Sequence, residues 1–308
     1  MEYFLQQLIN GLTLGAIYGL IAIGYTMVYG IIGMINFAHG EIYMLGAFIS
    51  LIAFLAATTI GGTSVPIALL ITLFATMILT SLWGWTVERV AYRPLRGAPR
   101  LAPLISAIGV SIVLQNLAMM IWGREYHAFP QLIANQSHHI AGAIINDIQI
   151  IIIIMALVIM LALMAVVHRT RLGRAMRAVA ENQHAAQLMG VDVNRVISVT
   201  FMLGSALAAI AGLMVSVNYG LAHYYMGFLL GLKAFTAAVL GGIGNLRGAM
   251  LGGLLLGLIE SLGAGYIGDL TGGFMGSQYQ DVFAFFVLIA VLVFRPSGLL
   301  GERLAERA

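Results

Sequence analysis

Nine apolar runs, most of them close to 20 residues long, constrain what this chain can fold into more than any other feature. They lie near residues 5–30, 37–58, 65–87, 101–122, 148–168, 197–217, 228–246, 249–267 and 281–295. A helix needs about 20 apolar residues to cross the hydrocarbon core of a bilayer. Hydrophobic residues make up 61% of the 308 positions and charged residues only 9%, against roughly 25% charged in soluble domains. The pattern predicts an all-α, polytopic transmembrane bundle with eight or nine spans, in a single domain over residues 1–308.

The apolar runs are continuous, as in IIIIMALVIMLALMAVV. An outer-membrane barrel would instead alternate apolar and polar residues along each strand. We therefore expect helices throughout the membrane part of the chain.

Arginine-rich segments indicate the orientation. Residues 88–100 carry four arginines, residues 168–196 carry five, and the tail after Phe294 carries three. Short loops rich in arginine stay on the cytoplasmic side, so we expect all three segments there. Residues 123–147, with one arginine and two acids, belong outside, and counting back three spans from Arg89 places the N-terminus outside. The net charge of +3 thus indicates membrane orientation and not nucleic-acid binding.

Residues 168–196 are the longest polar segment inside the chain. Good helix formers dominate from Gly173 to Leu188, and Gly190 stands where a helix often ends in a left-handed residue. We expect a short cytoplasmic helix here, which offers a surface on which another protein can act.

Glycine is the second strong signal, with 37 residues lying largely inside apolar runs. Several recur every fourth residue, namely Gly11, Gly15 and Gly19, then Gly244, Gly248 and Gly252, and finally Gly253 and Gly257. Such faces let helices approach closely in lipid. The plain interpretation is a tightly packed bundle, and the alternative is helices that break or move.

Residues 29–41 favour a broken helix. Glycines, Asn36, His39 and Glu41 interrupt an otherwise apolar stretch. Asn36 can cap a new helix whose first turns contain Glu41, because both residue types are favourable at that end. The alternative is an ordinary loop at the membrane surface with Glu41 in water. A buried acid, at a cost of about 2.5–3.5 kcal/mol at a helix centre, would need a partner or a function.

Lys233 is the only lysine and begins an apolar run. It either reaches to the membrane interface as an anchor or forms a salt bridge with a buried acid such as Glu41.

Nucleotide-binding and catalytic motifs are missing from the sequence. The glycines between 241 and 248 do not match G-x-G-x-x-G, and the single lysine lies in no Walker A motif. Hydrolase signatures and cysteine are also missing, and the adjacent His138 and His139 cannot share one helix face as a metal-binding pair would. We therefore predict no enzyme activity and no catalytic, cofactor-binding or metal-binding residue in this chain.

Five long segments carry a family resemblance that runs nearly end to end. They are GLTLGAIYGLIAIGYTMVYGIIGMINFAHGEIYMLGAF, ERVAYRPLRG, LISAIGVSIVLQN, GRAMRAVAENQHAAQLMGVDVNRVIS and GLKAFTAAVLGGIGNLRGAMLGG. They resemble the H-type membrane permease subunits of branched-chain amino acid ABC importers. The resemblance implies a multi-pass protein of the cytoplasmic (inner) membrane. Its implied partners are a second permease in a heterodimer, two ATP-binding cassette subunits that bind the ATP, a periplasmic amino-acid-binding protein and membrane lipid.

In the wider importer family, the loop that docks the ATPase follows an E-A-A-x-x-x-G pattern. Ala185, Ala186 and Gly190 match it here, while His184 stands at the glutamate position, which puts a glutamate-based contact in doubt. With these residues we assign Gly173, Arg174 and Arg177 to ATPase docking. The alternative for the two arginines is membrane orientation and lipid headgroup binding alone.

The expected function is import of Leu, Ile or Val by alternating access, with Asn36, His39, Glu41 and Lys233 along the translocation path. An ion-coupled secondary transporter or channel for a small amphipathic solute is the main alternative, and a membrane scaffold without a path is a third. Similar permeases serve amides, urea or other amino acids, so the substrate is open at this point.

Overall fold

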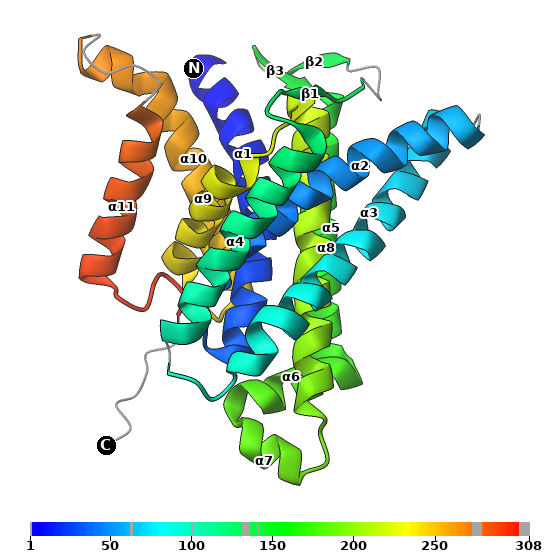
Figure 1. Ribbon diagram of the computed structural model, residues 1–308. Helices are drawn as coiled ribbons and strands as arrows, with labels where there is room; N and C mark the ends of the chain where they lie inside the picture. The colour runs from blue at the N-terminus through cyan, green and yellow to red at the C-terminus, as the bar shows by residue number, and fades with distance from the viewer. Residues whose placement is uncertain are drawn as a thin grey trace. The chain divides into compact units, whose positions relative to one another are not determined.

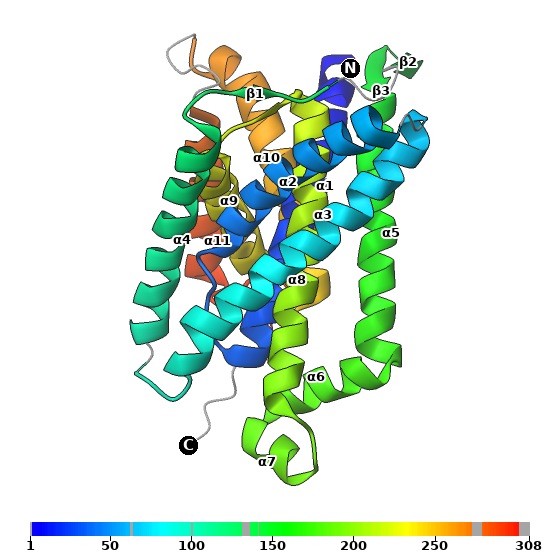
Figure 2. The same ribbon diagram turned by 45° about the vertical axis from the view of Figure 1, so that its right-hand side comes forward.

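A computed structural model describes residues 2–61, 64–99, 101–130, 136–140, 142–272 and 279–301. The architecture is almost entirely helical, with a few short strands (Figures 1 and 2). Long-range packing divides the chain into two compact units that interleave along the sequence. Unit 1 comprises Met1–Thr26, Ala134–Met160 and Lys233–Ala308, and unit 2 comprises Met27–Ile133 and Leu161–Leu232. Each unit is described by itself.

Unit 1 contains most of α1 (Glu2–Ile32), strands β2 (Ser137–Ile140) and β3 (Ala143–Asn146), the first part of α5 (Asp147–Arg169), the second part of α9 (Met226–Gly241), α10 (Leu246–Leu270) and α11 (Gln280–Phe294). Unit 2 contains the end of α1, α2 (His39–Gly61), α3 (Val65–Val87), the π-helix η1 (Glu88–Tyr92), the 3₁₀-helix η2 (Arg93–Leu95), α4 (Leu101–Trp122), β1 (His127–Ala128), the end of α5, α6 (Arg171–Glu181), α7 (Gln183–Leu188), α8 (Val193–Tyr219), β4 (Leu221–Ala222) and the start of α9. The antiparallel pairs β1–β4 and β2–β3 are the strand pairings within the described residues.

Membrane-length helices dominate. Across the described ranges, seven helices are long and apolar enough to cross a bilayer, and α9 and α11 are shorter apolar helices. With its 16 residues, α9 is about 24 Å long at 1.5 Å per residue, which is less than the hydrocarbon core of about 30 Å. The all-helical, membrane-spanning prediction is confirmed, and seven long plus two short helices agree with eight or nine spans.

The core of unit 2 is formed by α8 packed against α2 and α3. Small residues bring these backbones together. A Cβ on Gly46 of α2 would lie 2.7 Å from the Ala209 Cα on α8, and a Cβ on Gly212 would lie 2.6 Å from the Tyr43 carbonyl oxygen. On α3 the buried face is a row of small residues with a four-residue repeat, Ala68, Thr72, Thr76, Thr80 and Gly84. This row was not predicted from the sequence.

In unit 1, α1 lies against α10 through glycines on both helices. A Cβ on Gly15 would lie 2.6 Å from the Leu254 Cα, and a Cβ on Gly11 would lie 2.9 Å from the Leu258 Cα. From the other side, Gly253 and Gly257 meet the backbone of α1. The predicted packing faces on these two helices are confirmed.

One glycine of the predicted faces has a different role. Gly244 lies between α9 and α10 with φ +97°, so it makes the turn and does not pack along a helix. Gly248 and Gly252 do pack, against Gly241 and Ala237 of α9.

We expect Gly15→Ala to destabilise the folded protein. The added methyl group meets backbone atoms of Leu254, which cannot move aside as a flexible side chain can, and such overpacking costs about 1–3 kcal/mol. Thermal unfolding in detergent measures the effect. Gly109→Ala is the matched control because nothing lies within 4 Å of a Cβ there, and an unfolding temperature lowered equally in both variants would contradict the packing account.

Candidate functional site

The break between α1 and α2 is built by Gly33 and Asn36. Gly33 has φ +71° and directly follows the last residue of α1. The Asn36 side-chain oxygen accepts a hydrogen bond from the Ala38 backbone N–H at 3.1 Å, and the Asn36 carbonyl accepts one from the His39 N–H at 3.0 Å. Asn36 thus closes a turn just before α2. The predicted break is confirmed. The predicted cap is not, because the Asn36 side chain accepts from Ala38, which precedes α2, and not from an N–H of the helix itself.

Tyr92 holds this break from η1. Its hydroxyl donates to the Asn36 side-chain oxygen at 3.0 Å, and its ring packs on Phe201 of α8 with centroids 5.2 Å apart. Both Asn36 and Tyr92 are buried. The turn is therefore fixed to two other helical segments of unit 2.

Glu41 lies in the first turn of α2 and is 1% exposed. The Ser111 hydroxyl of α4 donates to its Oε1 at 3.2 Å. No donor in the described part of the chain reaches its Oε2. The surface-loop alternative is wrong, because Glu41 is enclosed by protein. The acid stands instead at the N-terminal end of a helix, where the macrodipole favours a negative charge.

Glycines leave room for Glu41. The start of α9 passes so close to Gly40 that a Cβ there would lie 2.8 Å from the Gly231 Cα, and a Cβ on Gly227 would lie 2.5 Å from the Glu41 Oε2. His39, in the same first turn, is also buried. The structure thus brings Asn36, His39 and Glu41 together at one place in unit 2, and their role in a translocation path stays a prediction.

Lys233 belongs to an ion cluster in unit 1. Its ammonium lies 3.2 Å from the Glu260 Oε2 of α10 and 2.7 Å from the Asp281 Oδ1 of α11, and the Tyr18 hydroxyl of α1 donates to the same Glu260 oxygen at 2.7 Å. Glu260 is 1% exposed. The exposed interface anchor is therefore wrong and the buried salt bridge is confirmed, with Glu260 in the place where we named Glu41. A path role for Lys233 stays a prediction.

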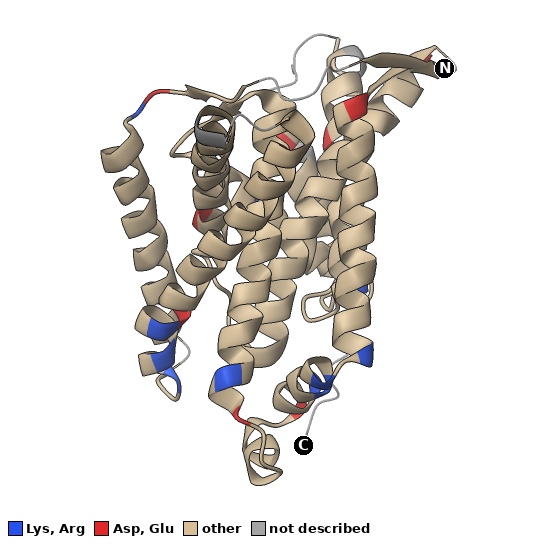
Figure 3. Ribbon diagram, turned by 90° about the vertical axis from the view of Figure 1, so that its right-hand side faces the viewer, with Lys and Arg blue, Asp and Glu red and all other residues tan. Residues whose placement is uncertain are grey.

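The end of unit 2 that carries α6 and α7 is rich in arginine. Figure 3 shows blue segments at the end of α3, in α6 and at the start of α8. Thr170 begins α6 by accepting a hydrogen bond from the Gly173 N–H at 3.1 Å. The expected single helix is wrong, because Asn182 ends α6 and caps α7, its side-chain oxygen accepting from the Ala185 N–H at 2.9 Å. Gly190, with φ +84°, follows α7 in the predicted left-handed conformation.

The residues that we assigned to docking differ in how far they are exposed. Gly173 and Ala186 are buried, and a Cβ on Gly173 would meet the carbonyl groups at the end of α5. These two positions shape the element and offer no docking surface themselves, which corrects their assignment. Arg174, Arg177, Ala185 and Gly190 are exposed.

The most exposed apolar side chains of this region are at the end of α7. Leu188 is 77% exposed and Met189 is 84% exposed, and both lie outside the seven membrane-length helices. At the other end of α7, the Gln183 side-chain amide donates to the Ile31 carbonyl at the end of α1, at 3.1 Å. One small helix therefore joins an exposed apolar tip to the helix that precedes the Asn36 turn.

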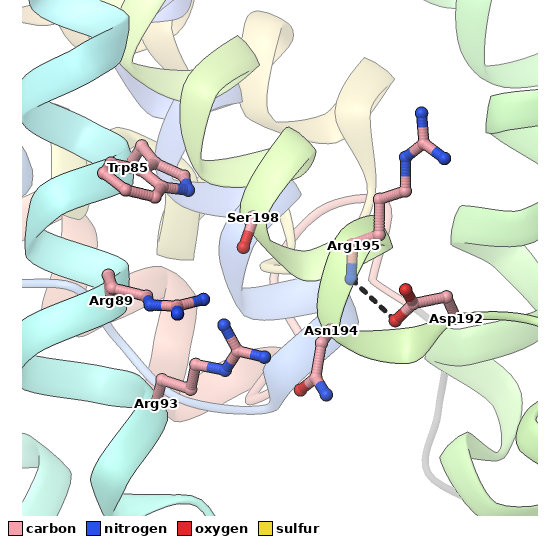
Figure 4. Close-up of a pocket in the computed structure, with 7 residues that line it drawn as sticks. All are labelled: Trp85, Arg89, Arg93, Asp192, Asn194, Arg195 and Ser198. Carbon is pink, nitrogen blue, oxygen red and sulfur yellow. Dashed lines mark hydrogen bonds between the residues drawn. The ribbon is translucent and has the colours of Figure 1, made fainter.

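A pocket of about 280 Å³ opens between α3 and η1 on one side and the start of α8 on the other. It is lined by Trp85, Arg89, Arg93, Asp192, Asn194, Arg195 and Ser198 (Figure 4). Beneath it Glu88, fully buried, pairs with Arg96 and accepts a hydrogen bond from the Ser198 hydroxyl at 2.6 Å. Burial lowers the pKa of the Arg96 guanidinium, and the Glu88 carboxylate opposes that shift.

Comparison with known proteins decides the family. The profile of the family described as "Branched-chain amino acid transport system / permease component" matches residues 7–292. The high-affinity branched-chain amino acid transport system permease protein BraD of Pseudomonas aeruginosa is 50% identical, over 99% of this chain and 98% of its own length. The chain belongs to this permease family. It is a transport permease and not an enzyme.

Two further relatives of this permease extend the comparison. The high-affinity branched-chain amino acid transport system permease protein LivH of Escherichia coli K12 is 46% identical, over 99% of this chain and 98% of its own length. The probable branched-chain amino acid transport permease protein LivH of Methanocaldococcus jannaschii is 26% identical, over 92% and 88%. The permease is a multi-pass protein of the cytoplasmic membrane and one component of a larger transport system.

Sequence reasoning missed several polar residues of this permease. Glu88, Tyr92, Ser111 and Glu260 were not singled out, although all four make the side-chain contacts described above. A signal existed for Glu260, since an acid inside an apolar run demands a partner. The partners Tyr92 and Ser111 carried no such signal, because only the folded chain brings them to Asn36 and Glu41.

Proposed function

We propose that this permease imports branched-chain amino acids (Leu, Ile and Val) across the cytoplasmic membrane as the transmembrane subunit of an ATP-driven importer. Its proposed partners are a second permease subunit, two ATP-binding cassette subunits and a periplasmic amino-acid-binding protein. ATP is bound by the cassette subunits, since the sequence has no Walker A motif of its own. The substrate class follows the names of the relatives, which cover this chain almost end to end.

One observation carries the proposal, namely the exposed tip of α7. Leu188 and Met189 expose apolar surface outside the membrane-length helices. Apolar side chains at such a place fit a protein partner, because burial against it removes their surface from water. Arg174 of α6 and Gly190 after α7 are exposed nearby in the chain. We assign this surface to docking of an ATP-binding cassette subunit.

The proposed coupling route runs from α7 to the Asn36 turn. Movement of a docked ATPase shifts α7, and the Gln183 amide transmits the shift to the Ile31 carbonyl at the end of α1. The next residues form the turn that holds Asn36 and precedes His39 and Glu41. A short turn between two helices can absorb the change in backbone dihedrals that alternating access requires.

The test is assembly with candidate ATPase subunits. The solubilised permease is expected to capture its ATPase, and a variant with substitutions at Arg174, Arg177 and Gly190 is expected to lose it while still inserting into the membrane. Arg124→Gln removes an arginine charge from an exposed position between α4 and β1 and is expected to assemble normally. Equal capture by the triple variant and the wild type would sink the docking assignment.

Gln183→Leu is expected to uncouple ATP hydrolysis from transport. It removes the side-chain hydrogen bond from α7 to Ile31 and leaves the exposed tip in place, so assembly and ATPase activity persist. Uptake falls about three- to tenfold, as for one lost hydrogen bond of about 1 kcal/mol. Uptake and ATP hydrolysis are measured together in vesicles. Gln187→Leu, at an exposed position on the same helix, is the control. Parallel loss of both activities would contradict a transmitting role.

A further inference from the structure

The pocket beside η1 is a positively charged site for which the transport cycle proposed above has no use. Three of its lining residues are arginines, and one is an acid. That acid, Asp192, already accepts a hydrogen bond from the Arg195 backbone N–H at 3.1 Å as the cap of α8. The lining thus carries a net charge of about +2, from three arginines less one aspartate.

Two of the arginines point into the pocket together. Figure 4 shows Arg89 and Arg93 extending from η1 and η2 toward α8, where the Ser198 hydroxyl points toward them, while the Arg195 guanidinium extends in another direction. The Asn194 side chain, which also lines the pocket, accepts a hydrogen bond from Arg96. Among the described residues, neither Arg89 nor Arg93 has an ion-pair partner within 4 Å, since the nearby Glu88 pairs with Arg96. Two neighbouring guanidinium groups that form no ion pair with a described carboxylate favour an anion with several acceptor oxygens, such as a phosphate.

The surroundings of the pocket are those of a membrane interface. The pocket lies at the end of the continuous helical segment Val65–Leu95, which is long and apolar enough to span a bilayer. Next to the arginines Trp85 is 41% exposed, and Leu82 and Val90 also expose apolar surface. Tryptophan beside arginine at the end of a span is typical of the level of the lipid headgroups.

We propose that this pocket binds the phosphate of an anionic phospholipid headgroup, held by Arg89 and Arg93. The Trp85 ring lines the site at the glycerol level, and the acyl chains lie along Leu82 and the neighbouring lipid-facing surface of α3. Basic pockets between membrane helices on the cytoplasmic side are known to suit such headgroups. The bound lipid joins α3 to the start of α8, the helix that follows α7 in the chain.

The test measures lipid binding to the full chain in detergent by native mass spectrometry, with palmitoyl-oleoyl phosphatidylglycerol as the probe and the corresponding phosphatidylcholine as the neutral comparison. One arginine near a headgroup contributes about fivefold in affinity. Arg89→Gln or Arg93→Gln is therefore expected to lower the affinity for the most tightly bound phosphatidylglycerol about fivefold, and the double variant about thirtyfold. Arg93→Lys is expected to retain most of the affinity, because the charge persists. Arg124→Gln, outside the pocket, is expected to bind as the wild type does.

Four results would overturn the proposal. If the double variant binds phosphatidylglycerol with wild-type affinity and its unfolding temperature is unchanged, the pocket is not the lipid site. If phosphatidylcholine binds as tightly as phosphatidylglycerol, the site does not select for charge. If inorganic phosphate binds with the same dependence on both arginines while the lipid does not bind, the pocket is a site for a soluble anion. Normal lipid binding by a double variant that no longer captures the ATPase would instead assign the pocket to a protein partner.

Discussion

Replacing Leu188 and Met189 together with glutamate is expected to reduce uptake to background. The two side chains are 77% and 84% exposed, so they make few contacts within the chain and their loss leaves folding intact. In the proposed complex with the ATPase they occupy the centre of the docking surface, where a truncated anchor costs about 2 kcal/mol or more. Two added charges at that place must also be desolvated. We therefore expect assembly with the ATPase to weaken by at least about a hundredfold.

The measurement is binding of the purified ATPase to the permease in detergent or nanodiscs, followed by uptake in vesicles. Gln187→Glu is the matched control, because it adds a charge at an exposed position of the same helix without removing an apolar anchor. If the double glutamate variant binds the ATPase as tightly as the wild type does, at equal expression and insertion, the tip of α7 is not the docking surface.

Glu41→Ala is expected to reduce uptake at least about tenfold while membrane insertion and unfolding temperature stay at or above their wild-type values. A carboxylate 1% exposed with a single hydroxyl donor, Ser111, is costly to keep in a membrane protein, by about 2.5–3.5 kcal/mol at a helix centre. Removing it relieves that cost, so loss of transport cannot be ascribed to loss of folding. Uptake of labelled leucine and thermal unfolding of the same preparation are the two readouts.

Ser111→Ala and Glu125→Ala show whether the loss of uptake comes from the Glu41 carboxylate itself, from its hydrogen bond, or from removal of any acid. Ser111→Ala removes the donor and leaves the carboxylate, so we expect a smaller loss of uptake than in Glu41→Ala. Glu125→Ala removes an exposed acid between α4 and β1 and is expected to transport normally. Wild-type uptake in Glu41→Ala would remove this residue from the translocation path.

The span pattern was predictable because length and hydropathy alone determine which segments a bilayer accepts. The break before α2 was also predictable, since Gly33, Asn36 and Glu41 each favour a helix end by a local mechanism. The packing faces of α1 and α10 were predictable from their four-residue glycine repeats, which have a direct geometric meaning on a helix.

Other features were not predicted, either because composition hides a single dividing residue or because tertiary packing selects the partner. The composition of residues 173–188 favours one helix, yet Asn182 divides it, because asparagine serves well both after one helix and before the next. Lys233 called for an acid, but the choice of Glu260 over Glu41 depends on which helices pack together within unit 1. The interleaving of two units likewise follows from long-range contacts that the order of the apolar runs does not reveal.

ATP-dependent uptake in a reconstituted system tests the central claim most directly. The permease, its proposed second permease and the ATPase subunits are placed in vesicles with ATP on the ATPase side, and the amino-acid-binding protein loaded with labelled leucine is added on the other side. We predict uptake that requires ATP and every subunit and that the Leu188 and Met189 glutamate pair abolishes. Leucine transport by this chain alone, driven by a sodium or proton gradient without ATP, would contradict the account and assign the permease to ion-coupled transport.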